Sequence, residues 1–182
     1  LSWSRELAKS TVAMFILMYL ALTKRKKFIV LASATEASAI RLLTPYKLNF
    51  ESNPRLRQFY GNQVTLGAWT DKDFTTRCGA KFVALGAGSA PRGARNEEVR
   101  PDVIYLDDYD TDEDCRNPET LKKKWDWFEG ALYPTRSISE PTLVLWCGNI
   151  IAKDCCIKHA GDRARHWDIV NIRDKNGRST WP

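Results

Sequence analysis

The sequence predicts an α/β domain in which helices flank a central, mostly parallel sheet. Short apolar runs of strand length alternate with helical segments along the chain, which is the order that parallel strands joined by crossover helices require. One run, residues 103–106, is continuously apolar, as is typical of a strand buried on both faces. With 182 residues, of which 43% are hydrophobic and 27% charged, the chain has the size and composition of one globular domain.

A helix is expected over residues 11–22. The segment is apolar almost throughout and is followed by the basic run 24–27, which suits a helix C-terminus. It is shorter than the roughly twenty apolar residues of a membrane span, and its charge does not precede it as in a signal peptide. We therefore expect it to be buried between the sheet and a covering layer. The apolar residues 28–32 then predict a buried strand.

The alternation of helices and strands is expected to continue through residue 85. A helix over 36–43 should stop at Thr44-Pro45, because proline interrupts the helical hydrogen bonds. A short helix over 54–60 begins at a proline, which favours the first helical position. Strands are expected over 63–68 and 81–85 from their apolar and β-branched residues.

Strands and helices continue to alternate in the second half of the chain. Residues 86–93 are rich in Gly, Ala and Pro and predict a loop. A strand is expected over 102–107, and Asn117-Pro118 should open a helix that extends to about residue 132. The remaining expected elements are a strand over 142–146, a helix over 153–159 and a strand over 166–172.

Two adjacent acids, Asp107 and Asp108, end the strand expected over 102–107. The carboxyl ends of strands in open α/β sheets are where ligands bind. Asp107 could hold a hydrated Mg²⁺, and Asp108 could orient or activate the water that attacks a phosphate. This is the pattern of a Walker B motif. The alternative is a solvated turn in an acidic segment, since Asp110, Asp112, Glu113 and Asp114 follow.

A candidate phosphate loop precedes the first helix. The P-loop pattern is G-x-x-x-x-G-K-[ST], and Lys9 and Ser10 fill its last two positions. Trp3 and Ala8 stand where the two glycines should be. Lys9 could reach the β- and γ-phosphates and Ser10 could join the Mg²⁺ shell, with the helix N-terminus facing the anion. The alternative is a chance sequence in which Ser10 caps the helix.

Other chemistries find little support in the sequence. His159 and His166, the only histidines, stand in no nucleophile–base arrangement, so no hydrolase triad is predicted. The five cysteines form an odd set without C-x-x-C, which fits a reducing cytosol. Cys155, Cys156 and His159 fit no zinc-site spacing. The net charge of +6 is compatible with a polyanionic partner but does not demand one.

Several motifs together resemble the large terminase subunits, the ATPases that pump DNA into viral capsids. Ser4–Thr11 resembles their deviant Walker A loop, which tolerates lost glycines and often has an arginine at the position of Arg5. Ser33–Thr35 is similar to their second ATPase motif, Arg92-Gly93 to an Arg-Gly pair before Walker B, and Trp146–Asn149 to the coupling motif. The order and spacing agree over nearly the whole chain. Asp108 departs from the more usual glutamate, and the segment after Arg92 looks longer than in some relatives.

The resemblance implies a P-loop NTPase of the RecA-like (ASCE) type that couples Mg-ATP hydrolysis to translocation of double-stranded DNA into a procapsid. ATP and Mg²⁺ would be its cofactors. Its partners would be double-stranded DNA, the portal protein, the small terminase subunit and further copies of itself in a ring, with no membrane. It would act in the cytoplasm of an infected bacterial host.

The resemblance also assigns roles to individual residues. Arg92 would stabilise the γ-phosphate in the transition state across a subunit interface, with Arg5 as the alternative within the chain. Asn149 would bond to the γ-phosphate or to the attacking water and report hydrolysis, although a Gly-Asn dipeptide also suits a plain turn. Asp108 would be the remaining catalytic residue, and Ser10 and Asp107 would hold the metal. The nucleotide-binding loop would comprise Arg5, Glu6, Leu7, Ala8, Lys9, Ser10 and Thr11.

The domain expected over residues 1–182 lacks the strand that normally precedes a phosphate loop, so we expect a fragment truncated at its N-terminal edge. The acidic cluster of a terminase nuclease domain is not visible, so no DNA cleavage is predicted. Two alternatives stay open. One is a helicase-like P-loop translocase, and the other is a non-catalytic remnant or scaffold module whose glycine-poor loop no longer binds nucleotide.

Overall fold

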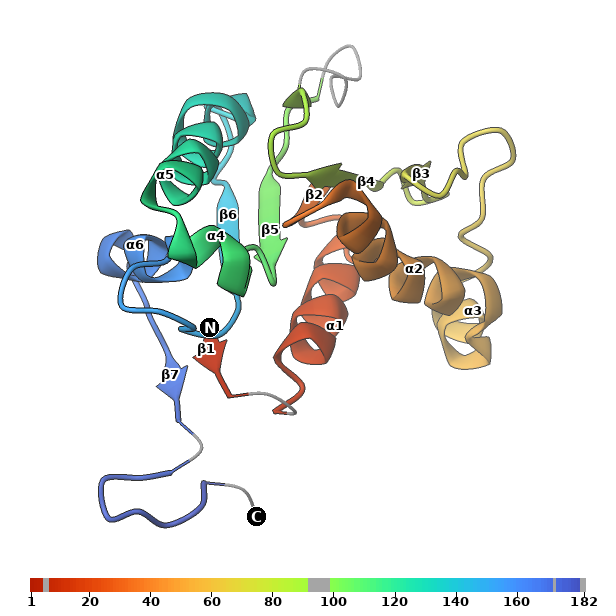
Figure 1. Ribbon diagram of the computed structural model, residues 1–182. Coiled ribbons are helices and arrows are strands. Elements are labelled where there is room, and N and C mark those ends of the chain that lie inside the picture. Colours follow the sequence, from red (N-terminus) through yellow and green to blue (C-terminus); the bar gives the residue numbers. More distant parts are fainter. Residues whose placement is uncertain (5–6, 92–98, 172, 181–182) are drawn as a thin grey trace.

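The computed structural model describes residues 1–4, 7–91, 99–171 and 173–180, and it has the predicted α/β architecture (Figure 1). In the described part, five strands form one sheet in the order β3-β4-β2-β5-β6, and β1 and β7 form a separate parallel pair. All neighbours in the large sheet are parallel except β3, which runs antiparallel to β4. The strands are β1 (Ser2–Trp3), β2 (Phe28–Ser33), β3 (Asp73–Thr75), β4 (Lys81–Gly86), β5 (Val103–Asp107), β6 (Leu143–Cys147) and β7 (Ile169–Val170).

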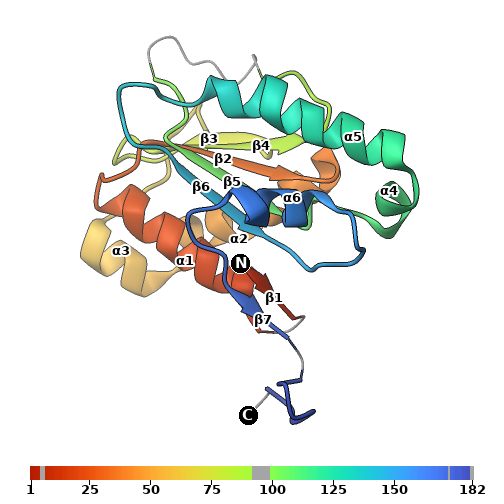
Figure 2. The same cartoon turned by 90° about the vertical axis from the view of Figure 1, so that its left-hand side faces the viewer.

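Helices cover both faces of the sheet (Figure 2). Helices α1 and α2 share one apolar core with one face, and α5, η2 and α6 share a second core with the other face. None of the helices in the described ranges is long and apolar enough to cross a membrane. The helices are α1 (Lys9–Leu22), α2 (Glu36–Ser52), α3 (Pro54–Tyr60), α4 (Asp112–Arg116), α5 (Pro118–Trp127), the π-helix η2 (Phe128–Leu132), the 3₁₀ helix η3 (Tyr133–Thr135) and α6 (Cys156–Arg163).

The central strands are buried on both faces, as their continuous apolar runs predicted. Every residue of β2 and of β5 is buried. Side chains alternate between the two faces along a strand, so Val103 and Tyr105 enter the core beneath α1 and α2, whereas Ile104 and Leu106 enter the core beneath α5. Asp107 continues the first series, and this parity directs its carboxylate toward the helix layer that contains the start of α1.

Helix α1 is only half buried, so the expectation of a helix covered on all sides was wrong. Ala13, Leu17 and Ala21 pack against the sheet. The opposite face exposes four large apolar side chains, with exposed fractions of 38–55%. An apolar composition all round therefore did not distinguish the buried face from the exposed one. The four exposed residues are Val12, Phe15, Ile16 and Tyr19.

The expected helix stop at Pro45 was also wrong, because α2 continues to Ser52. Proline in a helix interior removes one hydrogen bond and costs about 3 kcal/mol. Leu43, Tyr46 and Phe50 lie on one face of α2 and are buried against the sheet. Burying a large apolar side chain contributes about 1.5–3 kcal/mol, so these contacts outweigh the local cost.

Three other predicted boundaries changed. Residues 63–68 form no strand, because the Asn62 side chain accepts from the Val64 N–H and Gly67 turns the chain at φ 81°. Helix α6 begins at Cys156 instead of residue 153, and only Ile169–Val170 of the segment 166–171 is a strand. Short strands and irregular turns depend on contacts from distant parts of the chain, and these are invisible in local patterns.

Asp102 fixes the start of β5 against the start of β2. Its side chain, which is only 9% exposed, accepts hydrogen bonds from the backbone N–H groups of Lys27 and Phe28, both at 2.9 Å. The registry of β5 determines where the Asp107–Asp108 pair lies at the other end of the strand. Asp102 is therefore a structural contact that helps to place the acid pair.

The Asp102→Ala substitution should destabilise the fold by at least about 1 kcal/mol, because a buried N–H left without a partner, here that of Phe28, costs about 1–3 kcal/mol. The measurement is the midpoint of urea unfolding. Asp126→Ala is the matched control. Asp126 is exposed and forms an ion pair with the exposed Lys122, so its loss should cost less than about 0.5 kcal/mol. Equal effects of the two substitutions would contradict the role given to Asp102.

Candidate functional site

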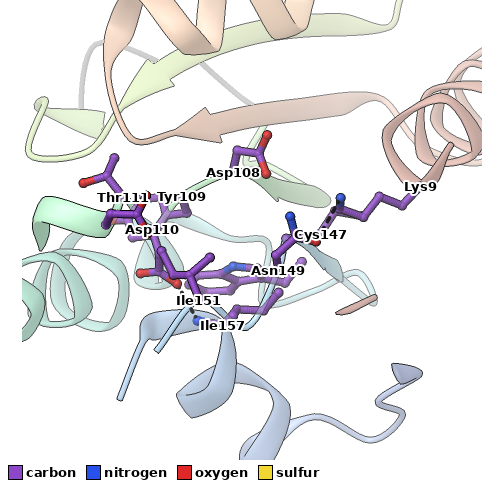
Figure 3. Close-up of a pocket in the computed structure, with 12 residues that line it drawn as sticks. Lys9, Asp108, Tyr109, Asp110, Thr111, Cys147, Asn149, Ile151 and Ile157 are labelled. Carbon is purple, nitrogen blue, oxygen red and sulfur yellow. Dashed lines mark hydrogen bonds between the residues drawn. The ribbon is translucent and has the colours of Figure 1, made fainter. Parts of the chain in front are cut away.

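The candidate site lies at the carboxyl edge of the sheet, where β5 and β6 end side by side. Asp107 and Cys147 are register partners at the last pair of these parallel strands. A pocket of about 440 Å³ opens there. Figure 3 shows Asp108 and Asn149 extending from the ends of the two strands, with Lys9 approaching from the start of α1. Three predicted site residues from distant parts of the sequence therefore line one pocket.

Lys9 is held toward the pocket by Asn149. Its ammonium donates a hydrogen bond to Asn149 Oδ1 at 3.4 Å, and the whole residue is only 8% exposed. Lys9 is the first residue of α1, so its charge lies at a helix N-terminus, where backbone N–H groups also face outward. A positive side chain and free N–H donors at one point make this end of α1 suited to an anion.

The residue before Lys9 has a left-handed backbone. Ala8 has φ 55° and ψ 23° and makes no side-chain cap to α1. This conformation costs a residue other than glycine about 1–2 kcal/mol. The second glycine of the P-loop pattern falls at this position. Glycine would adopt the left-handed backbone of residue 8 without this cost.

Asp107 is buried at the base of the site, with an exposed fraction of 4%. The Tyr105 hydroxyl donates a hydrogen bond to its Oδ2 at 2.6 Å. Its Oδ1 is buried and has no hydrogen-bond partner in the described part of the chain. Burial raises the pKa of Asp107, and the neighbouring hydroxyls of Ser10 and Tyr105 oppose that rise by favouring the charged form. A buried carboxylate with one free oxygen beside a serine hydroxyl fits a hard divalent cation such as Mg²⁺.

Asp108 differs from Asp107 in its exposure, in its contact with the pocket and in its backbone conformation. It is exposed, lines the pocket and has a left-handed backbone with φ 43°. This conformation is uncommon for residues other than glycine, although aspartate tolerates it better than most. It turns the chain immediately after β5, so that two consecutive carboxylates have different environments. One is buried beside α1 and one is free to meet solvent in the pocket.

Asp110 ties the loop after β5 to the other side of the pocket. Its carboxylate accepts hydrogen bonds from the N–H groups of Cys156 at 3.1 Å and Ile157 at 2.9 Å, and so caps the N-terminus of α6. Ile157 in turn contacts the backbone of Gly148, where a Cβ atom would lie only 2.9 Å from the Ile157 side chain. These contacts hold the ends of β5 and β6 and the start of α6 as one wall of the pocket.

A pair of two-residue strands, β1 and β7, holds the first residues of the chain in place. Strand β1 pairs with β7, and side chains of the two segments are joined by hydrogen bonds. The Trp3 indole donates to Asp168 at 2.9 Å and the Trp167 indole donates to the Ser2 hydroxyl at 3.0 Å. Trp3 is therefore held in a strand pair, where the P-loop pattern has its first glycine.

The predicted site residues divide into three groups. Lys9, Asp108 and Asn149 line the pocket, and Ser10 and Asp107 lie together just beneath it. Leu7, Ala8 and Thr11 are not among the described residues that line it. Three predicted residues, Arg5, Glu6 and Arg92, lie outside the described residues.

Two residues of the site were missed by the sequence analysis. Tyr105 precedes Asp107 by two positions on a strand, so the period of two already placed both side chains on one face. That signal was present and was overlooked. Asp110 was noticed only as part of an acidic segment. Nothing in the sequence connected it to residues 156 and 157, because that contact joins segments 46 residues apart.

Comparison with known proteins supports the fold. The ATPase domain of the large terminase of Thermus phage P74-26 superimposes with a TM-score of 0.51 and 16% sequence identity. The match covers 81% of this chain and 57% of that one, so the chain spans little more than half of the phage domain. No protein-family model and no curated protein sequence matches the chain. At this identity the likeness establishes a shared fold.

The Ala8→Gly substitution should stabilise the protein by up to about 1 kcal/mol. Glycine removes the cost of a left-handed alanine, about 1–2 kcal/mol, and loses about 0.5–1 kcal/mol of this through chain entropy. Thermal unfolding measures the change. Ala37→Gly, at an exposed position in the first turn of α2, is the control and should destabilise. A loss of stability in both variants would contradict the strain assigned to Ala8.

Proposed function

We propose that this chain is the ATPase domain of a terminase-type motor, which hydrolyses Mg-ATP and couples hydrolysis to the movement of double-stranded DNA. The observation that carries the proposal is the convergence of Lys9, Asp107, Asp108 and Asn149 at the carboxyl edge of a parallel sheet. Each motif is weak alone, whereas a lysine, two adjacent acids and an amide from three segments meet where such sheets bind ligands.

The residues divide the work of phosphoryl transfer, which rests on positioning and charge stabilisation. Lys9 and the N-terminus of α1 bind the β- and γ-phosphates. The bond from Lys9 to Asn149 gives way as the ammonium turns to the phosphates, which frees the amide for the γ-phosphate or the attacking water. Asp108, exposed in the pocket, orients that water. The arginine that completes the site is Arg92 from a neighbouring subunit or Arg5 from the same chain.

Asp107 and Ser10 are the residues that would hold Mg²⁺. The free Oδ1 of Asp107 offers a buried anionic oxygen, directly or through water, and the Ser10 hydroxyl lies beside the same carboxylate. A bound Mg²⁺ supplies positive charge to the β- and γ-phosphate oxygens. Tyr105 and the start of α1 keep these two protein groups in place.

The first test is nucleotide binding by thermal unfolding. Mg²⁺-ATP at a hundred times its Kd should add about 2.7 kcal/mol to the free energy of unfolding, because a ligand that binds only the folded state stabilises it. Lys9→Ala should abolish this gain. Lys123→Ala, an exposed lysine of α5, is the matched control and should retain it. If parent and Lys9→Ala melt alike with and without Mg²⁺-ATP, the chain is better described as a non-catalytic P-loop module.

The second test separates the two acids. The raised pKa of Asp107 means that its charge costs the folded state free energy once the pH exceeds the pKa of an unfolded aspartate. Asp107→Asn should therefore melt higher than the parent at pH 7 without nucleotide, yet lose the Mg²⁺-dependent gain with ATP. Asp108→Asn should keep both the melting temperature and the gain, and should hydrolyse ATP at least about 100-fold more slowly.

The outcomes of this second test exclude different parts of the proposal. A normal turnover rate in Asp108→Asn would exclude Asp108 from the water-orienting role. An Asp107→Asn protein that melts lower than the parent would mean that the buried charge is more fully compensated than its surroundings indicate.

DNA coupling is tested separately, by asking whether double-stranded DNA increases the ATPase rate of the parent.

A further inference from the structure

Tyr105 has an unusual position for a residue in the middle of a buried strand. It is completely buried in the core beneath α1 and α2, yet its hydroxyl ends at the functional edge of the sheet. There it donates a 2.6 Å hydrogen bond to Asp107 Oδ2, and this bond is itself buried. The sequence spacing explains the contact, because residues 105 and 107 of a strand project from the same face.

This bond leaves the two oxygens of Asp107 in different states. Oδ2 has a donor, whereas Oδ1 is buried and has no partner in the described part of the chain. The terminal torsion of an aspartate has broad preferences, so the side chain alone does not fix the plane of its carboxylate. The Tyr105 ring is fixed by its packing, so its bond to Oδ2 holds that plane, and the Ser10 hydroxyl is the other neighbour that favours the charged form.

We propose that Tyr105 is a positioning residue that sets the rotation of the Asp107 carboxylate and presents Oδ1 to the divalent cation. The inference rests on the proposed function, because it concerns the metal site of the ATPase. Groups that orient a metal ligand without touching the metal typically contribute about 10- to 100-fold to metal affinity or activity. Tyr105 acts on the cation only through Asp107.

A second tyrosine provides a matched control. Tyr46 of α2 is also buried and belongs to the same core. Burial raises the pKa of its hydroxyl, and the nearby charge of Asp107 raises it further. Its hydroxyl has no hydrogen-bond partner in the described ranges. Tyr46→Phe and Tyr105→Phe thus delete the same atom from the same core, and only one of them removes a bond to Asp107.

The experiment is a Mn²⁺ titration followed by electron paramagnetic resonance, with ATP present and excess protein, alongside steady-state kinetics at varied Mn²⁺. Tyr105→Phe should bind Mn²⁺ about 10- to 100-fold more weakly than the parent. Its kcat at saturating Mn²⁺ should stay close to the parent value, because Asp108 and Lys9 are unchanged. Tyr46→Phe should match the parent in both measurements.

The possible outcomes keep this inference separate from the proposed function. A parent protein that binds no Mn²⁺ with ATP contradicts the proposed function itself. A parent that binds Mn²⁺ and a Tyr105→Phe variant of equal affinity overturn the positioning role alone. Equal weakening in Tyr46→Phe and Tyr105→Phe also overturns it, because the effect would then come from general loosening of the core.

A folding defect in Tyr105→Phe would be decided by the double variant Tyr105→Phe/Asp107→Asn. The single variant removes one of the two hydroxyls that favour the buried charge of Asp107, and the Asn substitution removes that charge. Recovery of the parent circular dichroism spectrum in the double variant supports the bond between the two residues as the function of the hydroxyl. A double variant that also fails to fold assigns Tyr105 to packing and overturns the proposal.

Discussion

Parallel pairing of β2, β5 and β6 is the constraint on which the rest of the structure depends. Because the three strands run in one direction, their carboxyl ends lie at a single edge of the sheet. The polar residues that follow these strands therefore lie at that edge. Asp107, Asp108 and Asn149 reach the site in this way. The backbone hydrogen bonds of the sheet fix the strand ends, so the site is built on paired strands.

Contacts that cross between secondary-structure elements then turn this edge into a site. Lys9 meets Asn149 across the pocket, Tyr105 bonds to Asp107, and Asp110 caps α6. Each contact joins a strand or the segment after it to a neighbouring element of the fold. Two costs are concentrated at the same place, namely a left-handed Ala8 and a buried carboxylate with a raised pKa. Strain and incompletely satisfied polar groups typically gather at functional sites.

The Thermus phage terminase domain gives this architecture a context without settling its activity. A TM-score of 0.51 at 16% identity means that the sheet and its helices are shared, while nearly all side chains differ. The proposed function therefore rests on the residues that this chain itself brings together, Lys9, Asp107, Asp108 and Asn149. The glycine-poor segment before α1 is the sharpest departure from the P-loop pattern, and Ala8, which stands at the second glycine position of that pattern, has a left-handed backbone.

The sequence by itself determined the α/β class, the central strands and the acid pair, because a strand buried on both faces must be apolar throughout and its ends must be marked by polar residues. It also indicated Lys9 and Ser10 through their order in a motif. Only the tertiary structure decided that α2 continues through Pro45, that one face of α1 is exposed, and that Asp110 reaches α6. These features follow from packing between distant segments, which outweighs local propensity and leaves no periodic signal in the sequence.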